Sequence, residues 1–292
     1  MEKISVSFKN NVLSGLSFSL LIILYVIINL LFGVVLNSFV KISGLLRQIL
    51  SLCVPFLSII IVLIFVKKYT KQKFTNLFHV EKFSFLSLLL CVILCVGMIF
   101  GFGYVNDAFI SLLNKIGIKV SSNTLSMPTV RHYILFIFAY CLLPAVLEEL
   151  VFRGVILFKL EGCGKIFACL ISALCFSLYH LNFSQLIYQF IYGIFLGVLA
   201  IYSKSILPCI ITHFLNNFLV LTFTYFNVNI NLASPLIIAI GLAIIGAFLT
   251  ITILKLKKTK TQTIESKSGF FIPFGVMGII VSSVVILAGA FL

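Results

Sequence analysis

The segment YILFIFAYCLLPAVLEELVFRGVILF, residues 133–158, is apolar almost throughout. It is long enough to cross a lipid bilayer, because a hydrocarbon core about 30 Å thick requires about 20 apolar residues in a helix. The same segment carries two adjacent carboxylates, Glu148 and Glu149, and a guanidinium, Arg153. Charged groups are costly at membrane depth, so these three residues are candidates for a functional site.

The rest of the chain has the same apolar character. Of its 292 residues, 62% are hydrophobic and only 10% are charged, whereas a soluble domain has about 25% charged residues. Membrane-spanning strands require a closed barrel with alternating polarity, which these solidly apolar runs lack. The sequence therefore predicts an all-α, polytopic membrane protein with eight to nine transmembrane helices.

Polar breaks divide the chain into apolar runs that we interpret as spans. They lie at about 12–36, 45–66, 84–110, 133–158, 165–181, 185–202, 206–226, 233–254 and 270–291. We expect one integral membrane domain with three sections: residues 1–132 with spans one to three, 133–226 with spans four to seven, and 227–292 with spans eight and nine. Spans three to eight hold nearly all the unusual polar residues, and the middle section is the expected functional centre, a core of about four helices.

The charge distribution predicts the orientation of the chain. The formal net charge is +14, but the basic clusters lie at helix ends and no nucleic-acid-binding module surrounds them, so we expect no nucleic-acid partner. With a cytoplasmic N-terminus, most Lys and Arg residues fall in cytoplasmic loops, as the positive-inside rule requires. The basic runs at 67–73 and 255–260 are expected to touch anionic lipid headgroups. The prediction is a multi-pass protein of the cell membrane with the lipid bilayer as a partner.

Helical geometry separates the two glutamates. Glu149 and Arg153 are four residues apart and can form an ion pair on one helix face. The pair is far less costly to bury than either charge alone, which favours a structural role. Adjacent helical residues are about 100° apart, so Glu148 points elsewhere. It therefore needs a partner on another helix or a trapped water.

Three polar residues on the following spans lie at a similar depth. His180 is about as far after the Gly162–Gly164 turn as Glu148 is before it, so the carboxylate and the imidazole are expected to face each other. His213 and Asn217 are four residues apart and share a face of the seventh span. At about 1.5 Å per residue, all four groups lie roughly 13–25 Å from the cytoplasmic turns. We expect them to surround a chamber that is reachable from the cytosol.

A proline lies one turn before the glutamates. Pro144 has no N–H to donate to the carbonyl of Tyr140. We expect this to open the fourth helix and to admit water.

Two chemistries suit this set of residues. A carboxylate beside an imidazole can hold a water molecule and take its proton, while a second His with an Asn can donate hydrogen bonds to an oxyanion. Alternatively, Glu148, His180 and His213 are candidate ligands for a single divalent metal such as zinc, with one position left open. The residues by themselves do not choose between no cofactor and one metal ion.

The motifs Glu148-Glu149-x-x-x-Arg153, Phe176-x-x-x-His180 and His213-x-x-x-Asn217 resemble those of the CAAX-protease and bacteriocin-processing membrane proteins, the CPBP or Abi family. The resemblance covers roughly residues 133–226. It implies an intramembrane endopeptidase in which Glu148 and His180 activate water and His213 with Asn217 stabilises the oxyanion. Glu149, Arg153 and Phe176 would support the site. The family has been described both as metalloproteases and as metal-free glutamate proteases, and we favour the metal-free mechanism.

The resemblance implies a peptide or membrane-protein substrate. Relatives in eukaryotes cleave prenylated CAAX proteins, whereas bacterial relatives are linked to peptide processing and bacteriocin immunity. The chain is rich in Phe, Ile, Leu, Lys and Asn and has no Trp, which indicates an AT-rich bacterial genome and favours a substrate without a prenyl group. The alternatives are a non-catalytic bacteriocin-immunity or membrane scaffold protein that retains the motif, and a proton-coupled transporter. The oligomeric state is not predicted.

Overall fold

The computed structural model describes residues 2–38, 44–82, 84–118, 120, 127–228, 230–256, 270 and 275–291. All regular secondary structure in these ranges is helical, which confirms the all-α prediction. The α-helices are α1 (Glu2–Ser38), α2 (Gly44–Thr70), α3 (Phe74–Phe78), α4 (Phe85–Lys115), α5 (Val130–Phe136), α6 (Leu143–Glu149), α7 (Phe158–Leu160), α8 (Lys165–Tyr179), α9 (Phe183–Ser203), α10 (Leu207–Tyr225), α11 (Pro235–Leu256) and α13 (Val276–Phe291). Two π-helical segments, η1 (Ile137–Leu142) and η2 (Leu150–Leu157), and a 3₁₀ turn, η3 (Glu161–Cys163), complete the set.

Within the described residues, seven helices are long and apolar enough to cross a membrane. They match predicted spans one to four and six to eight. Predicted spans five and nine correspond to shorter apolar helices, Lys165–Tyr179 and Val276–Gly289. The multi-pass architecture is therefore confirmed, whereas the total of eight to nine spans stays a prediction. The basic run at 255–260 lies outside the described residues from residue 257 onward.

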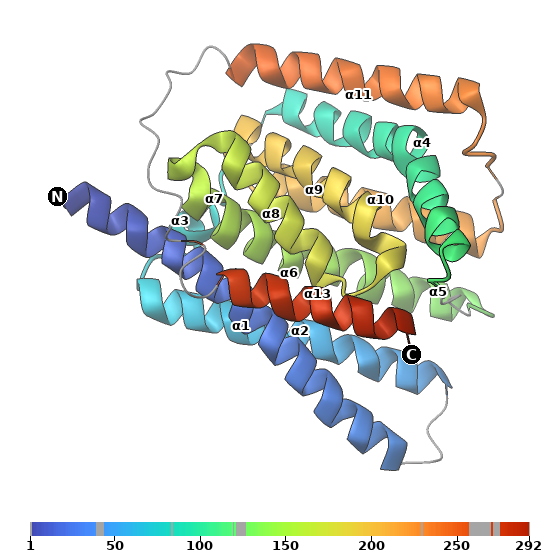
Figure 1. The fold of residues 1–292 in the computed structure, drawn as a ribbon. Coiled ribbons are helices and arrows are strands. Elements are labelled where there is room, and N and C mark those ends of the chain that lie inside the picture. The colour runs from blue at the N-terminus through green and yellow to red at the C-terminus, as the bar shows by residue number, and fades with distance from the viewer. Residues whose placement is uncertain are drawn as a thin grey trace.

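The long helices run side by side in a bundle (Figure 1). The pair α4 and α11 forms one side, and α1 with α2 and α13 forms the other. Between them lie α8, α9, α10 and the helix that contains α6, and α10 packs against both α4 and α6. The middle section of the sequence thus lies in the centre of the bundle.

Glycines allow two of these helix pairs to approach closely. A Cβ atom on Gly101 of α4 would lie 3.0 Å from the backbone of Gly241 on α11. A Cβ atom on Gly193 of α9 would lie 2.9 Å from the Cα atom of Ala173 on α8. Small residues at such crossings let helix backbones pack directly, as is common in membrane proteins.

The two ends of the bundle differ in their chemistry. At one end, the Ser205 hydroxyl donates to the Glu81 carbonyl over 2.9 Å and the Lys159 ammonium donates to the Gln72 side chain over 3.4 Å. We call this the basic end, comprising residues 71–82, 159–164 and 203–206. At the far end, comprising residues 106–115, 130–133, 182–185 and 224–232, the Asn106 amide donates to the Ser184 carbonyl over 2.9 Å. The sequence predicts that the basic end faces the cytoplasm.

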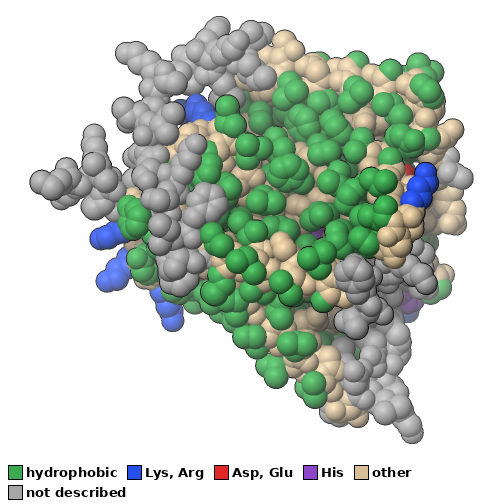
Figure 2. Space-filling model, in the orientation of Figure 1, with side chains coloured by type: hydrophobic (Ala, Val, Ile, Leu, Met, Phe, Trp, Pro, Cys, Tyr) green, Lys and Arg blue, Asp and Glu red, His purple; other side chains and the backbone are tan. Residues whose placement is uncertain are grey.

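The outer surface of the bundle is largely apolar. Hydrophobic side chains cover most of the face shown in Figure 2, and Lys and Arg lie near its opposite edges. Large side chains such as Leu30, Val34 and Leu236 are mostly exposed. A soluble protein rarely exposes so extensive an apolar surface, so this face is suited to contact lipid.

Candidate active site

The helix that carries the two glutamates is irregular. Residues 130–160 form one continuous helical run in which the π-helical segments η1 and η2 flank α6. Glu148 and Glu149 are the last two residues of α6. Single π-helical turns inside α-helices are rare overall, but those that do occur often lie at functional sites. They change the direction in which successive side chains point, and so they set how the two glutamates face the neighbouring helices.

Pro144 has no N–H, so it cannot donate to the Tyr140 carbonyl one helical turn earlier. That carbonyl has a partner on another helix. The Asn217 side-chain amide of α10 donates to the Tyr140 carbonyl over 3.2 Å. The sequence predicts an opened helix at this position, and the helix is indeed π-helical there. The free carbonyl, however, binds Asn217, so the proline positions one of the candidate catalytic residues.

Glu149 lies at the centre of a buried polar cluster. Its Oε1 atom accepts from Arg153 Nη1 over 2.8 Å and lies 2.9 Å from His213 Nδ1. Glu149 and Arg153 are fully buried, as a charged residue can be when it is paired. The guanidinium also donates to the Gly193 carbonyl over 3.2 Å, and its central carbon lies 4.5 Å from the centre of the Phe176 ring. The expected Glu149–Arg153 ion pair is therefore present, and it also holds His213.

Glu148 has a different environment from its neighbour. Its Oε2 atom lies 4.0 Å from His213 Nε2, and it has no hydrogen-bond partner within the described part of the chain. The sequence predicts that Glu148 faces His180, but among the described residues the only ion pair to Glu148 is the one from His213. Glu148 and His180 line the same cavity, so their facing each other stays a prediction, whereas the contact of Glu148 with His213 was not predicted.

His180 lies just beyond the end of α8 and is oriented by its own helix. Its Nδ1 atom lies 2.9 Å from the Phe176 carbonyl. Because a carbonyl only accepts, Nδ1 carries the proton and Nε2 is left as an acceptor in the neutral ring. Phe176 lies between the two imidazoles, with ring centres 5.1 Å from His180 and 5.7 Å from His213.

One cavity of about 550 Å³ brings the candidate residues together. Glu148, His180, His213 and Asn217 all line it. The supporting residues Glu149, Arg153 and Phe176 are buried behind its wall. A cavity with a few convergent polar groups is the usual form of a small-molecule or peptide site.

The cavity occupies only the half of the bundle toward the far end. On α10 it is lined by residues from His213 to Thr224, and on α9 by residues from Ser184 to Gln189. Its lining includes no residue of the basic end. The cavity therefore lies toward the end that the sequence predicts to face the outside, and the expected access from the cytosol stays a prediction.

Two site residues that the sequence analysis did not identify hold Asn217 in place. Tyr188 of α9 donates its hydroxyl to Asn216 Oδ1 over 2.8 Å, and Asn216 Nδ2 donates to Asn217 Oδ1 over 3.4 Å. With Oδ1 accepting from Asn216 and Nδ2 donating to Tyr140, one N–H of the Asn217 amide is left for a ligand. The adjacent asparagines inside an apolar span were a signal that could have identified Asn216.

The candidate metal ligands do not form a recognisable metal site. Within the described ranges, no three His, Cys, Asp or Glu side chains are placed to hold one metal ion. The His213 nitrogens face Glu149 and Glu148, and His180 Nδ1 faces a carbonyl. A shared ligand sphere for Glu148, His180 and His213 would require these side chains to move, so we derive no step through a metal.

The comparisons with known proteins agree with the motifs. Residues 130–219 match the family model described as Rce1-like, type II CAAX prenyl endopeptidase Rce1-like. No curated protein and no solved structure matches the chain. The matched segment contains every residue of the three motifs and confirms the sequence resemblance. Residues 130–219 are thus similar to a family of membrane proteases.

Proposed function

We propose that the protein is an intramembrane endopeptidase that hydrolyses a peptide bond in a membrane-associated peptide or protein. The observation that carries this proposal is the cavity that Glu148, His180, His213 and Asn217 line together. Glu148 has a carboxylate oxygen with no partner among the described residues, as a general base that must accept a proton from water requires. The match to a membrane protease family supports the same reaction class.

The proposed reaction begins with the activation of water. Glu148 and the acceptor Nε2 of His180 hold the water molecule, and Glu148 takes one of its protons. The hydroxide oxygen forms a bond to the scissile carbonyl carbon, and the carbonyl oxygen becomes an oxyanion. When the C–N bond breaks, the leaving amine takes the proton back from Glu148.

The oxyanion would be stabilised by two donors. The unused N–H of Asn217 is one of them. His213, whose Nδ1 atom lies 2.9 Å from Glu149 Oε1 and whose ring lines the cavity, would be the second donor through Nε2 when that nitrogen carries a proton. Tyr140 and Asn216 act as positioning residues for Asn217, and Arg153 acts in the same way for Glu149.

The Glu148→Gln substitution tests the proposed function. It keeps the size of the side chain but removes the base, so cleavage should fall by about 10²–10⁴-fold. Peptides in membranes that contain wild-type protein or the variant would be compared by mass spectrometry, and the thermal unfolding of both purified proteins would be measured. The matched control is Glu81→Gln, an exposed acid at the basic end, which should leave cleavage unchanged.

An unchanged peptide profile in Glu148→Gln, with normal insertion, would reject catalysis and favour a scaffold or immunity protein that retains the motif. The metal-free mechanism has a separate test. Cleavage should persist after treatment with a strong chelator. Loss of cleavage that added zinc restores would overturn this part of the proposal.

A further inference from the structure

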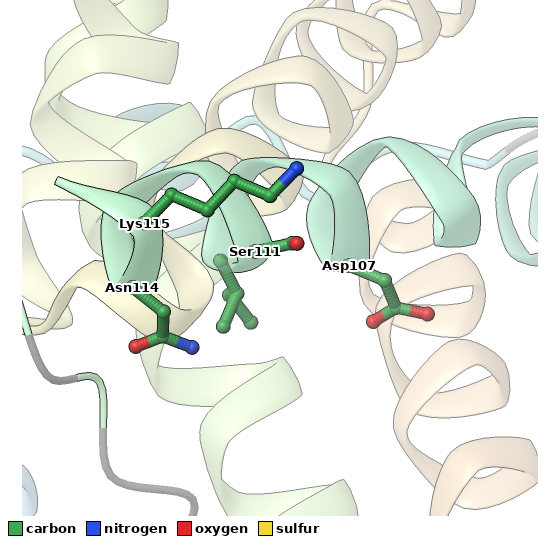
Figure 3. A pocket seen from close by; sticks show the side chains of 5 residues that line it. Asp107, Ser111, Asn114 and Lys115 are labelled. Carbon is green, nitrogen blue, oxygen red and sulfur yellow. The ribbon is translucent and has the colours of Figure 1, made fainter.

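The mouth of the cavity contains an acidic residue that the proposed reaction does not use. Asp107, near the C-terminal end of α4, is exposed and lines the cavity that contains Glu148. It also lines an adjoining depression of about 500 Å³ with Ser111, Asn114 and Lys115. Figure 3 shows that the side chains of Asp107 and Asn114 point to the same side of α4, whereas Lys115 extends along the helix. Among the described residues, Asp107 makes no ion pair.

At the mouth of the cavity, the charged side chain of the lining is acidic. Asp107 at the mouth and Glu148 at the inner end are its two carboxylates, and no Lys or Arg lines it. Walls of low dielectric constant concentrate the electric field of such groups. A positively charged ligand group is therefore attracted to the mouth.

The neutral side chains in the lining add further acceptors. Asn106 Oδ1 and Gln189 Oε1 are buried and have no hydrogen-bond partner within the described residues. Both residues line the cavity. Buried polar atoms normally have partners, so a ligand that brings N–H donors would complete these sites. An extended peptide with a basic residue supplies both kinds of group.

The length of the cavity determines how many peptide residues separate a basic residue at its mouth from a peptide bond held at Glu148. On α10, the lining extends from His213 to Thr224, which corresponds to about 16 Å at 1.5 Å per residue. An extended chain covers roughly 3.3–3.6 Å per residue. A basic residue at the mouth would thus lie about four to six residues from a peptide bond held at Glu148.

The geometry points to Asp107 as a specificity-determining residue that binds a Lys or Arg side chain, or an amino terminus, of a peptide entering from the far end. This inference rests on the proposed function. With the N-terminus in the cytoplasm, as the sequence predicts, the far end faces the outside of the cell. The substrate then belongs to the class of basic peptides that reach the membrane from its outer face.

A randomised library of apolar peptides tests this inference. Purified wild-type protein in micelles would be incubated with the library, and the products would be sequenced. Cleaved peptides should be enriched in Lys or Arg at one fixed distance from the cut. Asp107→Asn should abolish this enrichment and raise KM for a Lys-containing peptide about tenfold, with a smaller change in kcat. Asp107→Lys should shift the preference to Asp or Glu. Glu81→Gln should keep the wild-type preference.

Enrichment that persists in Asp107→Asn, or no enrichment in the wild type, would overturn the inference. If the wild type cleaves no peptide, the proposed function fails. A measurement of peptide binding then tests the role of Asp107 independently of cleavage. A fluorescent Lys-containing peptide would be titrated against Glu148→Gln and against the double variant Glu148→Gln/Asp107→Asn. About tenfold weaker binding by the double variant supports the role of Asp107. Equal binding, or no binding by either protein, contradicts it.

Discussion

The half of the bundle toward the basic end and the half toward the far end differ in whether their polar groups are buried in the core or line a cavity. Toward the basic end, Glu149 and Arg153 are fully buried and form an ion pair, although Glu149 Oε2 and Arg153 Nε have no hydrogen-bond partner among the described residues. Toward the far end, the cavity is lined by Glu148, Asn106 and Gln189, which have buried oxygens without partners in the described residues. The first half resembles a closed core, and the second half leaves its polar atoms available to a ligand. Adjacent residues thus differ, because Glu148 lines the cavity and Glu149 is buried behind its wall.

The largest expected effect is a loss of stability on substitution of Arg153, which tests the difference between the two halves directly. Arg153→Met removes the cation that balances Glu149 in a fully buried site. An unpaired buried charge costs about 3–5 kcal/mol, so the variant should unfold much more readily in a denaturant titration. Glu148→Gln removes a group with no hydrogen-bond partner and should change stability far less. Equal losses of stability in the two variants would show that the halves do not differ in this way.

The Asn217 contact should have an intermediate effect. Asn217→Ala leaves the Tyr140 carbonyl without its side-chain donor. A buried polar group that loses its partner costs about 1–3 kcal/mol. In a Pro144→Ala background, the N–H of residue 144 can donate to the Tyr140 carbonyl. Asn217→Ala should therefore lower the free energy of unfolding by a smaller amount in this background. A double-mutant cycle by chemical unfolding measures this coupling. Strictly additive effects would mean that the proline and the asparagine are not linked through this carbonyl.

The smallest expected effect is a pH dependence of stability caused by His79, which lies at the basic end. Burial lowers the pKa of the His79 imidazole, and the nearby Lys159 ammonium lowers it further, although Glu81 acts in the opposite direction. The folded protein therefore binds a proton less readily than the unfolded chain, in which His titrates near 6.5. Stability should be constant above that pH and should fall as the pH drops toward the pKa of the folded state.

Substitution of His79 by Asn isolates this effect. Residue 79 has a left-handed backbone conformation with φ of 51°, which Asn tolerates well. The variant should show a weaker loss of stability between neutral and mildly acidic pH, as measured by chemical unfolding at several pH values. An identical pH profile in the variant and the wild type would assign the acid sensitivity to other groups.

Much of the architecture could be predicted from hydrophobicity. Long apolar runs in lipid have few alternatives to helices, because every backbone polar group must be satisfied internally. The predicted spans therefore agree with the observed helices, apart from the shorter α8 and α13. The division of the chain at residues 132 and 226, the cytoplasmic N-terminus and the bacterial origin stay predictions.

The sequence by itself determined the local pairs, since Glu149 with Arg153 and His213 with Asn217 follow from the helical repeat. The three motifs also contain four of the residues that line the cavity, namely Glu148, His180, His213 and Asn217. Tertiary structure decided which partners cross between helices: His213 pairs with both glutamates, and Asn217 binds the carbonyl that Pro144 leaves free. It also decided that the cavity lies in the half of the bundle toward the far end. The physical reason is that helical spacing fixes neighbours along one helix, whereas contacts between helices depend on π-helical turns and close glycine crossings that shift and rotate each face.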